Sequence, residues 1–390
     1  MGRKRQGSEL YIFMNGKKVG LLSRGSTGKL ELRYDKNWLT SESGRPLSLS
    51  LPLTDQVYSG EVVENYFDNL LPDSQPIRNR IQKRFGAKSN NGFDLLWHIG
   101  RDCVGAIQIF PEDLEVDVQK IEAEPLDDTA IAETLKSYRT MPLGMREDKE
   151  FRISVAGAQE KTALLKLNDK WHLPLGTTPT SHIFKLPIGR IEHSGMDLSD
   201  SVENEWLCHA IFKAYEIPVA KTEIMSFEGV NTLVVERFDR RWSTDKSWLI
   251  RLPQEDMCQA LNVPPALKYE SDGGPGAESI MKLLLGSTNS LEDRKIFMTQ
   301  VFLFWVLGAI DGHAKNFSIF LAPGGAFQLT PAYDVMSAYP EESMAQIIQQ
   351  ILGDMDQVIE EVGSKLPKDF PDDISAPIFD GMKRARDRMK

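Results

Sequence analysis

The sequence predicts an α+β protein in which a small N-terminal α+β module precedes a β-rich lobe and then a helical lobe. Three observations support this prediction. The chain has 390 residues, which is enough for two or three domains. Short alternating apolar segments separated by turn signals dominate up to about residue 252, a pattern typical of β-strands. After Pro253 the apolar residues recur at helical spacing instead.

The composition narrows the class of protein further. Apolar residues make up 41% of the chain and charged residues 26%, which supports packed cores and excludes a largely disordered chain. The net charge of -10 argues against a globally basic nucleic-acid binder but leaves room for a local basic face. The three cysteines form no C-x-x-C pair, so we expect a reducing, cytoplasmic compartment and neither zinc site nor disulfide. The apolar stretch Val301 to Ile310 is too short to span a bilayer.

Residues 1–110 are expected to form the N-terminal module. The turn Asn15-Gly16 tolerates the positive φ of a hairpin and is flanked by apolar strands. The expected strands are Leu10 to Met14, Val19 to Leu22, Lys29 to Tyr34, Leu47 to Leu53 and Gly105 to Phe110. The expected helices are Val62 to Leu71, Ile77 to Phe85 and Phe93 to Ile99. For the basic segment Arg78 to Lys88, a surface facing DNA or tRNA and an ordinary solvated face both stay open.

Residues 111–150 are acidic and helix-like, and we expect them to connect this module to a β-rich part at residues 151–252. Strands of the β-rich part are expected at Ala163 to Leu167, His182 to Leu186, Thr222 to Ser226, Thr232 to Phe238 and Leu249 to Leu252. One helix, Glu203 to Tyr215, interrupts them. Residues 253–390 are expected to form the helical lobe, in which the apolar helix Leu291 to Ile310 is predicted to be buried nearly all round.

A motif directly after this long helix suggests phosphoryl transfer. Residues Asp311 to Asn316 read D-G-H-A-K-N, and protein kinases place a catalytic Asp five residues before a metal-binding Asn. Two apolar strands follow, and Asp334 then stands where a second magnesium carboxylate is expected. The alternative, that Asp311 caps a helix and Asp334 lies in an ordinary turn, is disfavoured by the combination of features. His313 contacts phosphate or metal, or holds the loop through a backbone hydrogen bond, and both roles stay open.

Two upstream segments add further candidates. Ser154 to Lys161 reads S-V-A-G-A-Q-E-K, whose small residues would let backbone N–H groups approach phosphate, although an ordinary hairpin is an equal alternative. Lys185 lies on an apolar strand, as does the kinase lysine that pairs with the α- and β-phosphates and with a helix glutamate. Glu203 and Glu205 open the next helix, and we slightly prefer the interpretation that both merely favour its N-terminus.

Together these residues resemble the HipA-type serine/threonine kinase toxins of bacterial toxin–antitoxin systems. In the N-terminal module the shared motifs are R-P-L-S-L-S-L-P-L (from Arg45), F-D-N-L-L-P-D-S (from Phe67) and I-G-R-D-C-V-G-A (from Ile99). Further along they are F-R-I-S-V-A-G-A-Q-E-K-T-A-L-L, V-E-R-F-D-R-R-W, L-P-Q-E-D-M-C-Q, K-Y-E-S-D-G-G-P-G and D-G-H-A-K-N-F-S. The resemblance covers almost the whole chain, and several motifs are long and specific.

The resemblance implies a two-lobed protein-kinase-like fold with an added N-terminal module, and ATP and Mg²⁺ as cofactors. It implies Asp311 as the catalytic residue and Asn316 and Asp334 as metal ligands. The implied ATP-binding residues are Ser154, Val155, Ala156, Gly157, Ala158, Lys185, Glu236, Phe238 and His313. Ser154 is also the implied autophosphorylation site, where a phosphate adds about -1.5 to -2 charges and would repel ATP and switch the enzyme off.

The resemblance further implies the target and the partner. The γ-phosphoryl group would pass to a protein serine, with glutamyl-tRNA synthetase as the family's best-known target and growth arrest and drug tolerance as the result. The implied partner is a HipB-type helix-turn-helix antitoxin, through which the complex binds operator DNA and represses its own operon. A kinase-like scaffold that acts only as a DNA-bound corepressor is the alternative, which the retention of Lys185, Asp311, Asn316 and Asp334 disfavours.

The segment after Ser337 to Pro340 departs from the family. Family members carry a further helical segment there, whereas this chain begins a helical stretch at Glu341. Either that segment is deleted, or the sequence joins two pieces of a longer chain. We favour the second explanation, which predicts a break after Pro340 wider than the ~3.8 Å between bonded Cα atoms.

Overall fold

A computed structural model describes residues 7–137, 159, 161–191, 196–340, 342–365, 368 and 371–389. The chain forms two compact units, Met1–Met336 and Ser337–Lys390. The domain boundaries expected at residues 110, 150 and 252 stay predictions. Within the described part of the chain, no helix combines the length and the apolar character that crossing a membrane requires.

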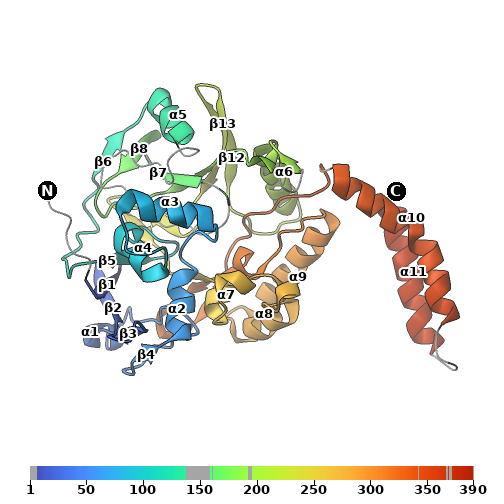
Figure 1. Cartoon of the computed structure of the whole chain (residues 1–390), viewed down its shortest axis with the longest axis horizontal. Coiled ribbons are helices and arrows are strands. Elements are labelled where there is room, and N and C mark those ends of the chain that lie inside the picture. The colour runs from blue at the N-terminus through green and yellow to red at the C-terminus, as the bar shows by residue number, and fades with distance from the viewer. Residues whose placement is uncertain are drawn as a thin grey trace. The chain divides into compact units, whose positions relative to one another are not determined.

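The first sheet begins the larger unit (Figure 1). Its antiparallel strands have the order β4-β3-β2-β1-β5. They are β1 (Glu9–Met14), β2 (Lys17–Arg24), β3 (Leu30–Tyr34), β4 (Tyr58–Ser59) and β5 (Ile107–Phe110). The helices alongside are α1 (Lys36–Leu39), α2 (Glu61–Asp68), α3 (Gln75–Phe85) and α4 (Gly92–Ile99). Asn15 and Gly16 adopt φ values of 45° and 80°, which confirms the predicted hairpin turn.

Two expectations in this region are wrong. Leu47 to Leu53 is not a strand, and its only pairing is an isolated bridge between Ser48 and Leu51. The alternation arises because Leu47 and Leu51 fill the core, while two prolines remove the N–H groups that a ladder needs. Arg78 on α3 does not belong to a basic surface, because it is buried and forms an ion pair with Asp68 at 2.7 Å.

The second sheet has the strand order β12-β13-β9-β7-β8-β6. Its strands are β6 (Ala123–Pro125), β7 (Lys161–Leu167), β8 (Lys170–Pro174), β9 (His182–Lys185), β12 (Thr222–Phe227) and β13 (Val230–Glu236). Helices α5 (Asp128–Ser137) and α6 (Ser201–Ala214) both pack against β12 and β13. They cover opposite faces, because Val234 belongs to the apolar cluster under α5, whereas Leu233 and Val235 belong to the one under α6.

The region expected to connect the two parts is not simply helical, since its described portion contains strand β6 before helix α5. The remainder, residues 138–150, lies outside the described residues. Two short ribbons complete the β-rich part. They are β10 (Gly189–Ile191) with β11 (Met196–Leu198), and β14 (Arg240–Trp242) with β15 (Leu249–Arg251).

The remainder of the larger unit is mainly helical but begins with a strand. β16 (Gln254–Asp256) pairs with β17 (Ser318–Leu321), which pairs with β18 (Phe327–Leu329). Helicity directly after Pro253 was therefore the wrong prediction for β16, whose three residues are buried against β17. The helices are α7 (Met257–Ala260), α8 (Ala277–Leu283) and α9 (Ser290–Val306), with short 3₁₀ turns at Pro265–Leu267, Glu270–Asp272, Leu284–Gly286, Ala314–Asn316 and Pro323–Gly325.

Helix α9 differs from its prediction in length and in burial. It ends at Val306, and Gly308 follows at a φ of 57°, the left-handed conformation that commonly stops helices. Within the described residues, Leu291, Phe302 and Trp305 are 83%, 57% and 55% exposed. Its buried positions include Phe297, Leu303 and Phe304, so the helix buries one stripe and not its whole surface.

Buried apolar side chains show how the parts of the larger unit are joined. One continuous cluster runs from the first sheet, with Leu10 and Ile12, into the second, with Leu164 and Phe184. A separate cluster, with Phe297 and Ile319, fills the helical part. The N-terminal residues therefore share a core with the β-rich lobe instead of forming an appended domain.

The smaller unit contains α10 (Glu342–Ser364) and α11 (Asp372–Met389), which contact each other. Both carry apolar residues at helical spacing. The break expected after Pro340 stays a prediction, because Glu341 lies outside the described residues.

Candidate active site

Lys185 lies at the centre of a buried ionic cluster. Its Nζ donates to Oε1 and Oε2 of Glu205 at 2.7 and 2.9 Å, and to Oδ1 of Asp334 at 2.7 Å. Lys185 ends strand β9, Glu205 lies on α6, and Asp334 comes from the segment after β18. Three elements distant in sequence thus converge on one ammonium group.

The electrostatics of this cluster keep its charges in place. Burial disfavours the charged form of Lys185, but the carboxylates of Asp334 and Glu205 outweigh it and raise the pKa of Lys185 above its ordinary value. Burial likewise opposes ionisation of Asp334, yet Lys185 and then Lys161 hold the pKa of Asp334 well below its usual range. Asp334 is therefore a carboxylate at neutral pH.

The backbone delivers Asp334 to this position. The segment before it pairs with the chain after α6, since Ala220 N donates to Ala332 O at 2.8 Å and Ala332 N donates to Pro218 O at 2.8 Å. Asp334 itself adopts a φ of 59°. A non-glycine residue in this left-handed region is uncommon and is found preferentially at functional sites.

A second lysine reaches the same cluster. Lys161 lies directly opposite Lys185 in the antiparallel pair of β7 and β9, so both side chains point to the same face. Lys161 is buried, and burial together with Lys185 lowers its pKa. Sequence reasoning missed Lys161, although its place one strand before Lys185 would have indicated it.

Glu205 corrects the preferred interpretation of the helix glutamates. Glu203 is exposed, whereas Glu205 is only 2% exposed and pairs with Lys185. The signal that could have separated them is the helical spacing of Val202, Glu205, His209 and Phe212, which all lie on the buried face of α6. His209 Nδ1 lies 3.3 Å from Ala220 O, and burial lowers the pKa of His209 to about 4.

The loop from Asp311 to Asn316 forms the second half of the site. Asn316 Nδ2 donates to the backbone oxygen of Asp311 at 2.6 Å, which leaves the amide oxygen of Asn316 available. The hydroxyl of Tyr269 donates to Oδ1 of Asp311, whose side chain is half-exposed. Tyr333 ties this loop to the segment of Asp334, since its hydroxyl donates to Lys315 O at 2.8 Å.

His313 lies between the two halves. Its Nε2 is 3.8 Å from Oδ1 of Asp311, and its ring stands edge-on to Tyr269 with centroids 5.0 Å apart. Burial lowers the pKa of His313, although Asp311 and Asp334 both act to raise it. The side chain therefore contacts the loop and faces both carboxylates, and its two predicted roles stay open.

The predicted hinge residues follow strand β13. Glu236 is exposed and pairs with Lys221 on the surface at 3.2 Å. Phe238 packs on Phe320 and Tyr333, with ring centroids 5.8 and 5.6 Å apart. Phe238 thus lies next to the segment that carries Asp334, as a residue between two lobes would.

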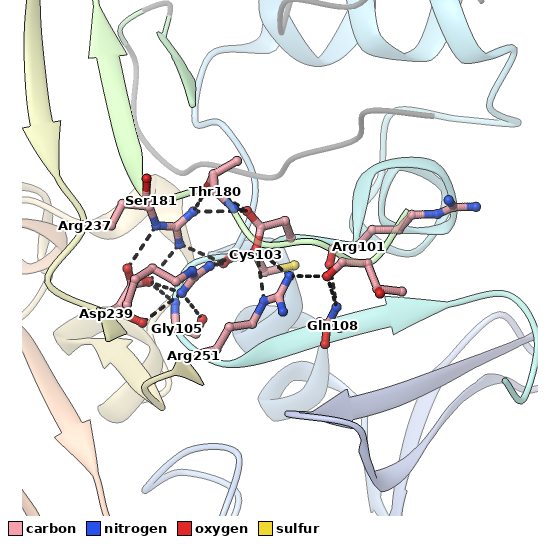
Figure 2. Close-up of polar contacts among 12 residues, drawn as sticks. Arg101, Cys103, Gly105, Gln108, Thr180, Ser181, Arg237, Asp239 and Arg251 are labelled. Carbon is pink, nitrogen blue, oxygen red and sulfur yellow. Dashed lines mark hydrogen bonds and ion pairs between the residues drawn. The ribbon is translucent and has the colours of Figure 1, made fainter. Parts of the chain in front are cut away.

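Buried charges anchor this hinge to the N-terminal residues (Figure 2). Arg237 donates to Asp239 at 2.9 and 2.8 Å and to the backbone oxygen of Cys103 at 3.0 Å. Asp102 accepts from Arg240 at 2.9 Å and from Arg251 at 3.1 Å. Because all of these side chains are buried, the chain on both sides of Phe238 is fixed against residues 102–105.

The remaining predicted ATP-binding residues cannot be placed. Ser154, Val155, Ala156, Gly157 and Ala158 lie outside the described residues. Gln159, which follows them, donates from Nε2 to Leu186 O at 2.7 Å. Their roles stay predictions.

The donor set suits a magnesium ion bound together with a nucleotide. Among the described residues, no group of three or more His, Cys, Asp or Glu side chains is arranged to hold a metal. A nucleotide-bound Mg²⁺ needs fewer protein ligands, because phosphate oxygens and water complete its shell. The carboxylate of Asp334 and the amide oxygen of Asn316 are hard oxygen donors of the right kind, so these residues fit the ion.

A β-rich lobe with a buried Lys–Glu pair, followed by a helical lobe with an Asp-x-x-x-x-Asn loop, defines a two-lobed protein-kinase-like fold. Comparison with protein families gives the particular group. The HipA-like C-terminal domain matches residues 153–380, and the HipA N-terminal domain matches residues 10–110. The chain belongs to the HipA family.

Individual relatives agree with this assignment. The putative kinase Y4mE of Sinorhizobium fredii is 34% identical over 346 residues, which cover 86% of this chain and 79% of that protein. The serine/threonine-protein kinase toxin HipA of Shewanella oneidensis is 29% identical over 351 residues, covering 86% and 76%. A solved complex of Shewanella oneidensis HipA, HipB and operator DNA contains a chain with the same fold, at a TM-score of 0.71 and 24% identity over 97% of this chain and 96% of that one.

Proposed function

We propose that this chain is an ATP-dependent serine/threonine protein kinase that acts as the toxin of a toxin–antitoxin pair. The observation that carries the proposal is the convergence of Lys185, Glu205 and Asp334 beside the loop of Asp311 and Asn316. Membership of the HipA family and the kinase names of its relatives support the same activity.

Each buried charge has a role in this proposal. Lys185 and Lys161 contact phosphate oxygens, and Glu205 keeps the ammonium of Lys185 directed into the site. Asp334 and Asn316 hold Mg²⁺, which when bound bridges the β- and γ-phosphates and neutralises their charge. The predicted loop of Ser154 to Ala158 covers the phosphates, and Glu236 and Phe238 receive the adenine.

Asp311 orients the attacking hydroxyl and accepts its proton. The serine oxygen bonds to the γ-phosphorus while the bond from that phosphorus to the bridging β–γ oxygen breaks, so the products are phosphoserine and ADP. The half-exposed position of Asp311 is suited to this step, because a protein substrate must reach it from solvent.

Radiolabelled ATP tests the proposal directly. The wild-type protein should label itself and added glutamyl-tRNA synthetase, and Asp311→Asn should reduce the label by about 10²- to 10⁴-fold because the proton acceptor is lost. The same variant should no longer arrest growth. A wild-type protein that labels neither would sink the kinase proposal and leave the corepressor scaffold as the function.

Ser154 is proposed as the site of self-inactivation. Ser154→Ala should abolish autophosphorylation while label still passes to other substrates, because its hydroxyl is the acceptor and not part of the transfer machinery. Mass spectrometry of the labelled protein identifies the modified residue. Unchanged autophosphorylation in Ser154→Ala would refute this assignment.

The proposed partner is a HipB-type antitoxin, with operator DNA bound through the complex in the cytoplasm. The solved Shewanella oneidensis complex of HipA, HipB and operator DNA supports this partnership by analogy. The protein mixed with its antitoxin should elute as one complex from a sizing column and retard operator DNA in a gel. Separate elution of the two proteins would contradict the proposed pairing.

A further inference from the structure

A segment of the N-terminal motif F-D-N-L-L-P-D-S reaches the loop that carries Asp311 and Asn316. Asn69, one residue past the end of α2, is buried, and its Nδ2 donates to Asn65 O and to Val263 O, both at 2.9 Å. These two bonds fix Asn69 between the N-terminal residues and the helical part. Its oxygen atoms are thereby directed at Lys315.

Lys315 connects the loop to this segment. Its Nζ donates to the backbone oxygen of Asn69 at 3.0 Å, to Oδ1 of Asn69 at 2.8 Å and to Oδ2 of Asp256 at 3.0 Å. Oδ1 of Asp73 lies 3.8 Å from the same ammonium. Burial opposes the charge of Lys315, but Asp256 and Asp73 outweigh it and raise the pKa of Lys315, so the side chain is a fixed cation.

Asp73 also contacts a second segment of the site. Its Oδ2 accepts from Lys268 Nζ at 3.0 Å. The backbone oxygen of Lys268 accepts from Ala314 N at 3.1 Å, and the neighbouring Tyr269 donates to Asp311. One carboxylate therefore holds the cations of both segments that surround Asp311.

We propose that Asn69 and Asp73 are positioning residues for phosphoryl transfer, acting through Lys315 and Lys268 on the loop that carries Asp311 and Asn316. This proposal rests on the kinase function proposed above and deepens it. The N-terminal residues then form part of the catalytic apparatus, in addition to any role in binding a partner.

The physical basis is the geometric precision that the reaction requires. Asp311 must stay within hydrogen-bond reach of the attacking hydroxyl, and displacements of about 1 Å at such a group cost on the order of 10²-fold in rate. A short loop flanked by 3₁₀ backbone has few contacts of its own with which to hold that position. The two lysines with Asp73 and Asp256 balance in charge, which makes the buried network self-compensating.

The test compares two charge-removing variants of the same motif. Asp73→Asn removes the carboxylate charge that faces both lysines. Asp68→Asn is the matched control, because Asp68 pairs at 2.7 Å with Arg78 of α3 and contacts neither lysine. Rates are expressed per nucleotide-binding site, titrated with a non-hydrolysable ATP analogue, so that partial unfolding does not imitate a catalytic defect.

We expect Asp73→Asn to lower kcat by about 10- to 100-fold with little change in KM for ATP, and Asp73→Glu to restore part of the loss. Asp68→Asn should leave both constants close to wild type. Equal losses in the two Asn variants, or a loss in KM alone, would overturn the positioning role.

Amide hydrogen exchange separates this inference from the kinase proposal. Asp73→Asn should exchange faster in peptides covering residues 267–273 and 311–317, and Asp68→Asn should not. Unchanged exchange in Asp73→Asn would overturn the placement of the loop by Asp73 even in an active enzyme. A wild-type protein without kinase activity would overturn the catalytic role, whatever the exchange pattern.

Discussion

Two glutamates on α6 show how much a single residue position decides. Glu203 and Glu205 are two residues apart, and both precede the middle of the helix. A separation of two residues places them on different faces, so Glu203 stays in solvent while Glu205 reaches Lys185. The ammonium of Lys185 would otherwise be held by Asp334 alone, the residue proposed to bind the metal.

Removing the charge of Glu205 should therefore impair catalysis. Glu205→Gln is expected to lower the rate of label transfer from ATP by about tenfold or more, because Lys185 loses a carboxylate that orients it. The matched control is Glu203→Gln on the same helix, which should transfer label at the wild-type rate. Equal activity of the two variants would contradict a role for Glu205 in the site.

Glu255 on β16 gives a prediction about pH. Its Oε1 accepts from Leu49 N at 2.8 Å, and burial raises its pKa from 4.5 to about 8. The folded protein thus holds this proton more tightly than the unfolded chain does. The resulting contribution to stability is complete below pH 4.5 and is lost as the pH rises to about 8.

Glu255→Gln should remove this pH dependence. Between pH 5 and 8, the free energy of unfolding should fall more steeply in the wild type than in the variant, by a few kcal/mol at about 1.4 kcal/mol per pKa unit. Urea denaturation at a series of pH values measures the two slopes. Glu223→Gln, at an exposed position on β12, should keep the wild-type slope, and parallel curves for all three proteins would contradict the prediction.

At the scale of elements, the loop before β5 is fitted closely to β16. Gly105 adopts a φ of 72°, and its N–H donates to Oδ2 of Asp239 at 2.7 Å. A Cβ atom at this position would lie 2.7 Å from Gln254 O. The conformation and the close approach both require glycine here.

Gly105→Ala should destabilise the protein through both effects. Gly60 is the matched control, since it has a φ of 78° and open space where a Cβ would lie. Gly60→Ala should cost about 1–2 kcal/mol from the left-handed backbone alone, and Gly105→Ala about 1–3 kcal/mol more from the steric clash. Chemical denaturation measures both. Similar losses would show that the contact with β16 relaxes without cost.

At the scale of the whole molecule, a buried charge network links the beginning of the chain to its middle. Asp102 accepts from Arg240 and Arg251 and forms an ion pair with Arg237 at 3.4 Å (Figure 2). These arginines hold the pKa of Asp102 well below its usual range even though burial opposes its ionisation. Together with the apolar cluster shared by both sheets, this network makes the N-terminal residues inseparable from the β-rich lobe.

Asp102→Asn should expose the strength of that link. Removing one partner from a buried ion pair costs about 3–5 kcal/mol, because the arginines would stay buried with a single carboxylate, that of Asp239. Asp113→Asn is the control, since Asp113 is half-exposed in its pair with Lys18, and surface pairs contribute at most about 1 kcal/mol. Urea unfolding followed by tryptophan fluorescence provides the comparison, and equal midpoints for the two variants would contradict the link.

The sequence alone determined the order of the lobes, most strands and helices, and the residues of the candidate site. It did so because these features are local: the spacing of apolar residues defines the elements, and Asp311, Asn316 and Asp334 stand at short, characteristic separations. The family followed from the same motifs. The roles of the site residues and the domain boundaries remain predictions.

Only the tertiary structure decided which polar groups meet. Glu205 pairs with Lys185 across 20 residues, Asp102 with Arg240 across 138, and Lys315 with Asn69 across 246. No periodicity encodes such partners, because each pairing depends on how separate elements pack. The same reason explains the errors: the apolar pattern of α9 cannot tell which faces are covered, and that of Leu47 to Leu53 cannot show that no neighbouring strand is present.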